Sequence, residues 1–354
     1  MQMEFSKVLL NWYQENKRDL PWRRTTDPYK IWLSEIILQQ TRVDQGLPYY
    51  LKFTQTFPTI FDLASASEDQ VLKLWQGLGY YSRARNLHET AKRIVDEFNG
   101  VFPNSFEHIK SLKGVGDYTA SAIASISFGL PHAVVDGNVY RVLSRVFGIY
   151  EPINTTSGIK IFKSLAQELL DKNDPANFNQ AIMEFGARHC KPNQPFCNDC
   201  GFKESCVAKI KNEVSIIPVK IKKTKVKKRY FNYLVVVDNA NKTLIQQRLD
   251  KDIWQKLFEF PIIETQYIAS EDEILRSSLL QELFSDSKEL KFYKFNSEPV
   301  IHKLSHQHLH TTFWIFETAK NQICNTHIGN LGAYAFPVLI QDFIDKFSFN
   351  QVII

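Results

Sequence analysis

Four of the five cysteines in this 354-residue chain lie between residues 190 and 206. Cys190, Cys197, Cys200 and Cys206 follow the spacing C-x6-C-x2-C-x5-C, which lets one short loop direct four thiolates toward a common centre. Tetrathiolate sites hold zinc or an iron–sulfur cluster, and the spacing does not choose between them. Because a closed set of four thiolates has no open position for substrate, we expect a structural or redox role.

A second candidate is Glu35 in the segment DPYKIWLSEIILQQTR. The pattern predicts a helix that is capped by Asp27 and begins at Pro28. Glu35 then shares a face with Ile31 and Trp32, and burial among such groups raises the pKa of a carboxyl group. A carboxyl that holds its proton near neutral pH can serve as a general acid. The alternative is a glutamate that reaches a polar edge of the helix.

The third candidate is Asp136, where an apolar segment ends and a second helix is expected to follow. A helix N-terminus stabilises an anion, so we expect the pKa of Asp136 to fall. Two carboxyl groups shifted in opposite directions can cleave a glycosidic bond, one protonating the leaving group while the other stabilises the oxocarbenium ion. A helix cap with no further role is the alternative for this aspartate.

The segment SLKGVGDYTASAIASI places Gly114 and Gly116 in a turn before a helix, with Asp117 as the expected N-cap. Backbone N–H groups of such a turn can bind a phosphate without a basic side chain. A plain turn between two helices is the alternative, because Gly-x-Gly alone is a weak signal.

The elements that must position these residues change character along the chain. From residue 4 to about 186, apolar residues recur at intervals of three and four residues, which predicts helices. Residues 230–238, 242–248 and 311–318 alternate with a period of two, which predicts strands, and residues 270–284 predict a helix. The fold class is therefore multidomain, with an all-α domain followed by an α+β domain.

We expect three segments: a helical domain over residues 1–211, a basic linker over 212–229 and an α+β domain over 230–354. The linker contains seven basic residues, which form a solvated tether or contact DNA: Lys220, Lys222, Lys223, Lys225, Lys227, Lys228 and Arg229. A net charge of +5 is compatible with a polyanionic partner. The clustered thiols predict a reducing, cytoplasmic and nucleoid-associated location. Because the sequence shows no signal peptide and no long apolar stretch, we expect no membrane contact, and we expect a monomer.

The order of these motifs resembles the helix-hairpin-helix DNA glycosylases that carry a [4Fe-4S] cluster, the endonuclease III superfamily. Within it, SEIILQQTR, GLGYYSRARNL and HKLSHQHLH resemble the adenine DNA glycosylases of the MutY family, and the likeness covers nearly the whole chain. The resemblance implies a helix-hairpin-helix glycosylase domain whose cysteine loop holds a [4Fe-4S] cluster. It also implies that the second domain is Nudix-like and recognises the lesion.

By this resemblance the partner is duplex DNA with adenine opposite 8-oxoguanine or guanine, and the adenosine is flipped into a pocket. Glu35 would protonate adenine at N7. Asp136 would stabilise the oxocarbenium ion, directly or through a transient covalent adduct, while Tyr118 and Asn138 position the reacting groups. Tyr118 replaces the Schiff-base lysine of strand-cutting relatives, so we expect no efficient β-lyase step. The nearby Lys113 is the one objection, although its position before the hairpin does not match that of the family's nucleophile.

The same resemblance assigns Gln40, Thr41, Leu78 and Tyr80 to a wedge that enters the base stack and reads the oxidised guanine. For Leu78 and Tyr80 a place in the core is the alternative.

In the second domain, Leu304, Ser305 and His306 replace a Phe-Ser-His loop that contacts 8-oxoguanine in the family. The hydroxyl and imidazole keep their hydrogen-bonding capacity, whereas the stacking aromatic is lost. Histidines 302, 306, 308 and 310 could alternatively form a metal site, although no carboxylates complete it. No Nudix hydrolase motif follows residue 230, so we expect recognition without hydrolysis.

Two other functions stay open at this stage. One is a non-catalytic, metal-stapled DNA-binding protein on the same scaffold. The other is a strand-cutting pyrimidine glycosylase, against which Tyr118 argues.

Overall fold

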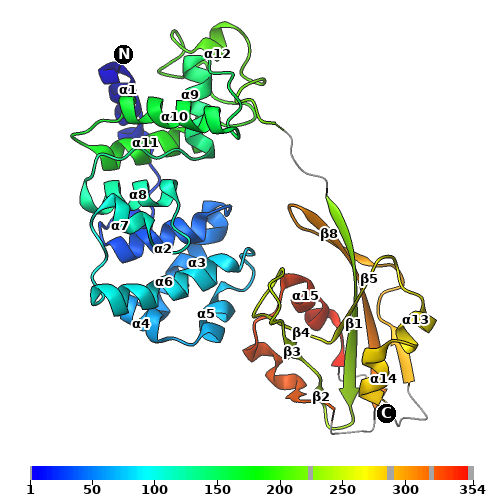
Figure 1. Cartoon of the computed structure of the whole chain (residues 1–354). Helices are drawn as coiled ribbons and strands as arrows, with labels where there is room; N and C mark the ends of the chain where they lie inside the picture. Colours follow the sequence, from blue (N-terminus) through cyan, green and yellow to red (C-terminus); the bar gives the residue numbers. More distant parts are fainter. Residues whose placement is uncertain (1, 222–225, 285–290, 319–322, 350–354) are drawn as a thin grey trace. The chain divides into compact units, whose positions relative to one another are not determined.

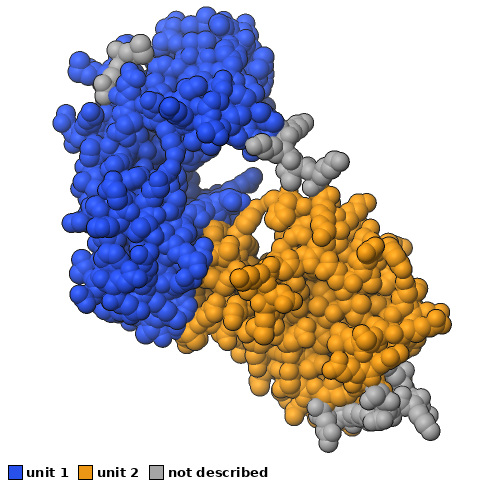
Figure 2. Space-filling model, in the orientation of Figure 1, with its two compact units in different colours: residues 1–66, 86–222 blue, residues 67–85, 223–354 orange. Residues whose placement is uncertain are grey.

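The computed structural model describes residues 2–221, 226–284, 291–318 and 323–349. The chain forms two compact units (Figure 2): residues 1–66 with 86–222, and residues 67–85 with 223–354. The second unit therefore combines a short early segment with the C-terminal part of the chain. Among the described residues, no helix is both long enough and apolar enough to cross a membrane.

The first unit is helical (Figure 1), as predicted for residues 4 to about 186. Its elements are α1 (Gln2–Asn16), η1 (Pro21–Arg23), α2 (Pro28–Leu38), α3 (Val43–Thr56), α4 (Ile60–Ser65), α7 (Phe106–Lys110), α8 (Asp117–Phe128), α9 (Gly137–Phe147), α10 (Thr156–Leu169), α11 (Pro175–Arg188) and α12 (Val207–Ile210). Helix α5 (Glu68–Trp75) belongs to the second unit, and α6 (Ser82–Phe98) carries residues of both units.

Helices α2 and α9 begin where the sequence predicts. The Asp27 carboxylate accepts a hydrogen bond from the Tyr29 N–H (3.0 Å), and Pro28 is the first residue of α2. Asp136 caps α9 in the same way. These two caps fix the direction in which each helix leaves its loop.

The hairpin between α7 and α8 differs from the expectation at one residue. Gly116, not Asp117, is the N-cap of α8, and Asp117 is its first helical residue. The Asp117 carboxylate pairs with Lys110 (2.6 Å) and Lys163 because these ammonium groups lie within its reach. Gly114 has a φ of +78°, a conformation that glycine adopts without strain.

Helices α1, α9, α10 and α11 enclose an apolar core that also anchors the cysteine loop. Phe202 of that loop is buried and stacks on Phe5 of α1, with ring centroids 5.0 Å apart. Cys190, Cys200 and Cys206 pack against the same core. The thiols are therefore held by the helical domain itself.

The second unit is built on a mixed sheet with the order β6-β8-β1-β2-β9, in which β5 also pairs with β1 and β7 with β8. Its central strands β1 (Lys227–Asp238) and β8 (Gln307–Thr318) are parallel over their full length. The others are β2 (Lys242–Thr243), β5 (Ile262–Thr265), β6 (Lys291–Lys294), β7 (Val300–Lys303) and β9 (Thr326–His327). Strand β1 begins inside the segment expected as the linker, whose residues 222–225 lie outside the described residues.

Alternation along the two central strands produces a separate apolar core on each face of the sheet. One core contains Tyr233 and Phe313, and the other contains Leu234 and Trp314. Around them lie α13 (Glu271–Leu275), α14 (Ser278–Phe284), η2 (Ile328–Ala333) and α15 (Val338–Lys346). The predicted helix 270–284 is thus two short helices, and the predicted strand 242–248 is two short strands, β2 and β3 (Gln246–Gln247).

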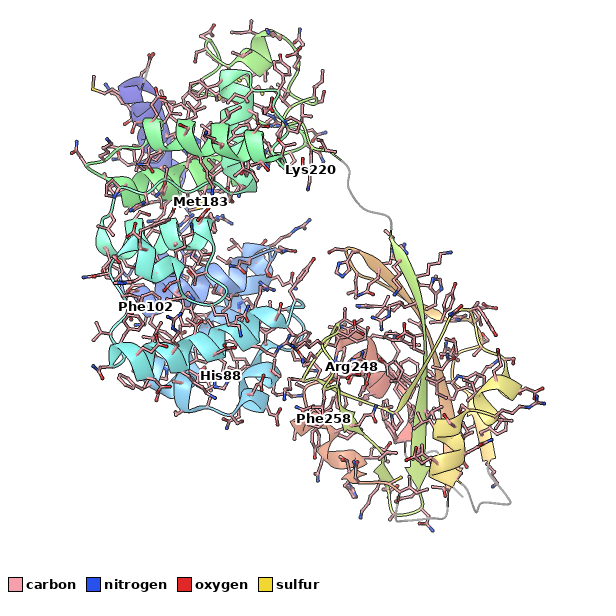
Figure 3. The ribbon with its side chains drawn as sticks, in the orientation of Figure 1. His88, Phe102, Met183, Lys220, Arg248 and Phe258 are labelled. Carbon is pink, nitrogen blue, oxygen red and sulfur yellow. The ribbon has the colours of Figure 1, made fainter. Side chains whose placement is uncertain are left out.

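Strand β3 pairs with β4 (Phe258–Glu259) in a small second sheet. Arg248, labelled in Figure 3, follows β3 and ion-pairs with the buried Glu259 carboxylate (2.6 Å). This pair ties the residues after β3 to β4 inside the unit.

Candidate active site and lesion-contact residues

Both candidate carboxyl groups line one cavity of about 180 Å³ in the first unit. Glu35 comes from α2, and Asp136 comes from the start of α9. Tyr118 of α8 and Asn138 of α9 line the same cavity. All four residues expected to take part in the chemistry are therefore brought together.

Glu35 is buried inside α2, with 8% of its surface exposed. Burial raises the pKa of this carboxyl to about 7; a hydrogen bond from Tyr118 lowers it, and the charge of Asp136 raises it. The predicted direction is confirmed, and the carboxyl retains its proton to higher pH than an ordinary glutamate does.

Asp136 accepts three hydrogen bonds at its carboxylate. One oxygen accepts hydrogen bonds from the backbone N–H groups of Asn138 and Val139 (2.8 Å each), and the other accepts one from the Asn138 side-chain amide (2.8 Å). The predicted fall in its pKa is wrong: burial raises it, and the hydrogen bonds only partly oppose the rise. The donors still favour the anion, because an ionised carboxylate accepts at both oxygens.

Tyr118 lies between the two helices that carry the acids. Its hydroxyl hydrogen-bonds to Glu35 and lies 3.3 Å from the sulfur of Met183, a residue of α11 labelled in Figure 3. Burial raises the pKa of this phenol well above its ordinary value, so it stays neutral. A neutral donor beside Glu35 can orient that carboxyl without competing for its proton.

A second set of polar residues lines the cavity and was not predicted from the sequence. The buried Glu184 carboxylate accepts two hydrogen bonds from the Arg18 guanidinium and one from the Arg23 guanidinium, each 2.7 Å long. Burial acts to raise the pKa of Glu184, but the two guanidinium groups outweigh burial and lower this pKa to about 2. Gln180, one turn earlier on α11, also lines the cavity.

One signal for this set was present in the sequence. Glu184 is the acid in a helix, α11, that also carries the large apolar residues Phe178 and Phe185. A single acid among such residues calls for a cationic partner. The arginines lie more than 160 residues earlier, so the pattern alone could not identify them.

A chain of hydrogen bonds connects the cavity to the cysteine loop. The Asn138 amide donates to Asp136, and its carbonyl accepts from the Arg141 guanidinium (2.8 Å). Arg141 also donates to the backbone carbonyls of Cys190 (2.7 Å) and Gly186 (2.6 Å). These hydrogen bonds connect the backbone at Cys190 with the residue that holds Asp136.

The four loop cysteines are electrostatic neighbours. Burial is the main cause that raises the pKa of Cys200 to about 11, and each of the other three thiols contributes to this rise. Arg145 is buried beside them and donates to the Cys190 sulfur (3.5 Å) and to the Lys191 carbonyl (2.7 Å). Among the residues that the structure describes, no three His, Cys, Asp or Glu side chains are placed to hold a single metal ion.

The expected lesion-contact residues fall into two groups. In the second unit, Leu78, Tyr80, Ser305 and His306 line one cavity of about 410 Å³, and the hydroxyls of Tyr80 and Ser305 are hydrogen-bonded. Leu78 is 6% exposed and Tyr80 is 44% exposed, so only the tyrosine is presented at the surface.

The remaining two wedge residues belong to the first unit. Thr41 lines the cavity that contains Glu35, and Gln40 is exposed with a φ of +56°. Leu304, which stands in place of the family's aromatic, packs against the core of the second unit.

Comparison with known proteins places these features in a family. Residues 33–168 match the HhH-GPD superfamily of base excision DNA repair proteins, and residues 232–346 match the NUDIX domain. An adenine DNA glycosylase of Buchnera aphidicola is 36% identical over 313 residues, covering 88% of this chain and 86% of its own. The chain belongs to the adenine DNA glycosylase family. The human adenine DNA glycosylase is 47% identical over 58% of this chain and 39% of its own length.

Solved structures support the fold of this adenine DNA glycosylase family member. A thermostable thymine-DNA glycosylase covers 59% of the chain and 97% of its own, with a TM-score of 0.56 and 31% identity. An endonuclease III–DNA complex covers 60% of the chain with a TM-score of 0.52, and at 20% identity it supports the helical fold alone.

Proposed function

We propose that the protein removes adenine opposite 8-oxoguanine or guanine in duplex DNA by hydrolysing the N-glycosidic bond, without efficient strand cleavage. Membership of the adenine DNA glycosylase family supports adenine as the base. The observation that carries the chemistry is the shared cavity of Glu35 and Asp136. A carboxylic acid and a carboxylate beside one sugar are sufficient for glycosidic cleavage.

Glu35 acts as the general acid. With a pKa of about 7 it holds a proton that it can deliver to N7 of a flipped adenine, which makes the base a better leaving group. The Tyr118 hydroxyl keeps the carboxyl oriented toward the cavity. Once the bond breaks, the carboxylate left on Glu35 can activate the attacking water.

Asp136 stabilises the positive charge that develops on the sugar. Its negative charge is held in place by three donors that are already oriented before DNA binds. Asn138 supplies two of these donors, so it is a positioning residue for Asp136. Stabilisation occurs through space or through a transient bond to C1′ of the deoxyribose.

The Arg18–Arg23–Glu184 cluster and Gln180 supply the polar edge of the adenine pocket. Adenine offers an amino donor and ring-nitrogen acceptors, which match the amide of Gln180 and the carboxylate–guanidinium pairs. Because each charge in the cluster is already paired, the pocket does not rely on the base to neutralise a buried ion.

The absence of strand cleavage rests on the nucleophile. A β-lyase step needs an amine that forms a Schiff base, and the described residues lining the cavity include no lysine. Lys113 instead pairs with Glu89 and is about half exposed.

Recognition of the opposite base is assigned to the second unit. Tyr80 can stack on a base, and Ser305 and His306 can hydrogen-bond to the edge of 8-oxoguanine. All three line the same cavity, which supports a common ligand.

Cys190, Cys197, Cys200 and Cys206 would hold a [4Fe-4S] cluster. The chemistry of the donor set fits, because thiols are soft ligands, the other three thiols act electrostatically on Cys200, and Arg145 donates to the Cys190 sulfur. When bound, the cluster supplies a cross-link for the loop and a redox centre.

The decisive test is adenine release from a duplex containing A opposite 8-oxoguanine under single-turnover conditions. We expect release by the wild-type protein and a roughly 10²–10⁴-fold slower reaction for Glu35→Gln. The exposed Glu97→Gln serves as the matched control and should react normally.

Tight DNA binding without any adenine release would replace the enzyme assignment with the non-catalytic DNA-binding alternative. Borohydride trapping of a lysine–DNA adduct as efficiently as product forms would instead indicate a strand-cutting glycosylase.

A further inference from the structure

The loop between α5 and α6, residues 76–81, presents Tyr80 at the surface of the second unit. Three of its residues have backbone conformations with positive φ: Gly77 (+100°), Gly79 (+68°) and Tyr80 (+44°). A tyrosine is strained in this left-handed conformation, and two glycines add freedom that the folded loop must lose. Other groups must therefore hold the loop in place.

Arg83, in the first turn of α6, supplies much of that restraint. Its side chain is buried (8% exposed), and one guanidinium nitrogen donates to the carbonyls of Leu78 (3.2 Å) and Gly79 (3.3 Å). The Trp75 indole N–H donates to the same Gly79 carbonyl (3.1 Å). Two consecutive peptide groups before Tyr80 are thus fixed from one side.

The same guanidinium also lies between two aromatic rings. Its central carbon is 5.0 Å from the Trp75 ring centroid and 5.8 Å from that of Tyr80. A cation over an aromatic face favours one orientation of the ring. Arg83 therefore restrains both the backbone before Tyr80 and the tyrosine ring itself.

We propose that Arg83 is a positioning residue for lesion recognition: it holds the 76–81 loop so that Tyr80 meets the base opposite adenine in one orientation. The proposal rests on the function proposed above. Because Tyr80 also hydrogen-bonds to Ser305, the orientation set by Arg83 determines whether tyrosine and serine present one common surface. Loss of Arg83 should then weaken the preference for 8-oxoguanine over guanine.

The test uses binding, so that it does not depend on catalysis. The probes are two duplexes with a non-hydrolysable 2′-fluoro-deoxyadenosine, one opposite 8-oxoguanine and one opposite guanine. The readout is the ratio of the two dissociation constants for the full-length protein. The variants are Arg83→Met, Arg83→Lys, Tyr80→Ala and the double variant Arg83→Met/Tyr80→Ala.

We expect the ratio to fall about tenfold in Arg83→Met and to a similar extent in Tyr80→Ala, with no further fall in the double variant. Arg83→Lys keeps the charge but not the planar donor, so it should recover part of the ratio. Arg93→Met on the exposed side of the same helix is the matched control and should leave the ratio unchanged.

An unchanged ratio in Arg83→Met overturns the proposal, even if that variant melts at a lower temperature, and so do additive effects in the double variant. A wild-type protein with no preference between the two duplexes also overturns it. Failure of the proposed function is a separate result, since it appears as absent adenine release while the binding ratio can still be measured.

Discussion

Glu35 and Asp136 lie in one cavity but have different hydrogen-bond partners. Glu35 receives a single hydroxyl donor, whereas Asp136 accepts three N–H groups. Burial raises the pKa of both, but three hydrogen bonds favour the Asp136 anion, whereas a single one favours that of Glu35. This asymmetry supports the proposal that Glu35 is the acid and Asp136 the carboxylate.

The pH dependence of excision follows from these two groups. In the proposed mechanism the reaction needs protonated Glu35, so the single-turnover rate should fall as pH rises through about 7. The same mechanism needs ionised Asp136, so the rate should fall again in the acid range. The measurement is adenine release from about pH 5 to about pH 9 at constant ionic strength. A rate that keeps rising with pH would contradict protonated Glu35 as the acid.

At this scale the sequence revealed residue types but not burial. The raised pKa of Glu35 was predictable because its apolar neighbours are three and four residues away on one helix. The predicted fall in the pKa of Asp136 was wrong, because the residues that bury its carboxyl come from distant parts of the chain. Glu184 was missed for the same reason: its arginine partners lie far away in sequence.

At the scale of elements, helices α9 and α11 approach closely beside the active site. A Cβ atom added at Gly186 would lie 2.7 Å from Cβ of Asn138 and 2.9 Å from its backbone oxygen. The absence of a side chain at Gly186 therefore lets α9 hold Asn138, and through it Asp136, where the structure has them.

Gly186→Ala should force these helices apart. We expect a loss of about 1–3 kcal/mol in the free energy of unfolding and slower excision, because Asn138 is displaced. Denaturant unfolding and single-turnover kinetics check the two effects. The control is Gly332→Ala in the second unit, where an added Cβ has no neighbour within 4 Å. Equal stability of the two variants would contradict this account.

Most elements were predictable from periodicity and capping residues. Asp27, Pro28 and Asp136 marked two helix starts correctly, because an Asx cap and a first-turn proline act locally. Asp117 was not the cap, since Gly116 has the extended conformation required and the aspartate pairs with two lysines instead. Local sequence signals locate the start of a helix to within one residue. Contacts with distant residues then determine which side chain acts as the cap.

At the scale of the whole molecule, the surface of the second unit that we propose contacts the lesion comes from two segments of sequence. Tyr80 belongs to the early segment and Ser305 to the late one, and their hydroxyls are hydrogen-bonded. No periodicity reports a pairing across 225 residues, so only the resemblance to a family suggested that these residues act together.

Tyr80→Phe and Ser305→Ala remove the same hydrogen bond from opposite ends. Each should weaken binding to the 8-oxoguanine duplex several-fold, for a bond worth about 0.5–1.5 kcal/mol, and the double variant should lose little more than either single variant. Dissociation constants for the full-length protein test this. Tyr267→Phe, which loses an exposed hydroxyl in the same unit, is the control. Fully additive losses would mean that the two hydroxyls act separately.

The second unit combines an early and a late segment of the chain, and this affects when the unit can fold during synthesis. Lys73 donates to the carbonyl of Tyr334, and Gln76 donates to Gln341, across separations of 261 and 265 residues. The late partners are synthesised long after helix α5, so α5 can make these contacts only when residues 334–341 have been made. The surface that we propose contacts the lesion therefore cannot be complete before that point of synthesis.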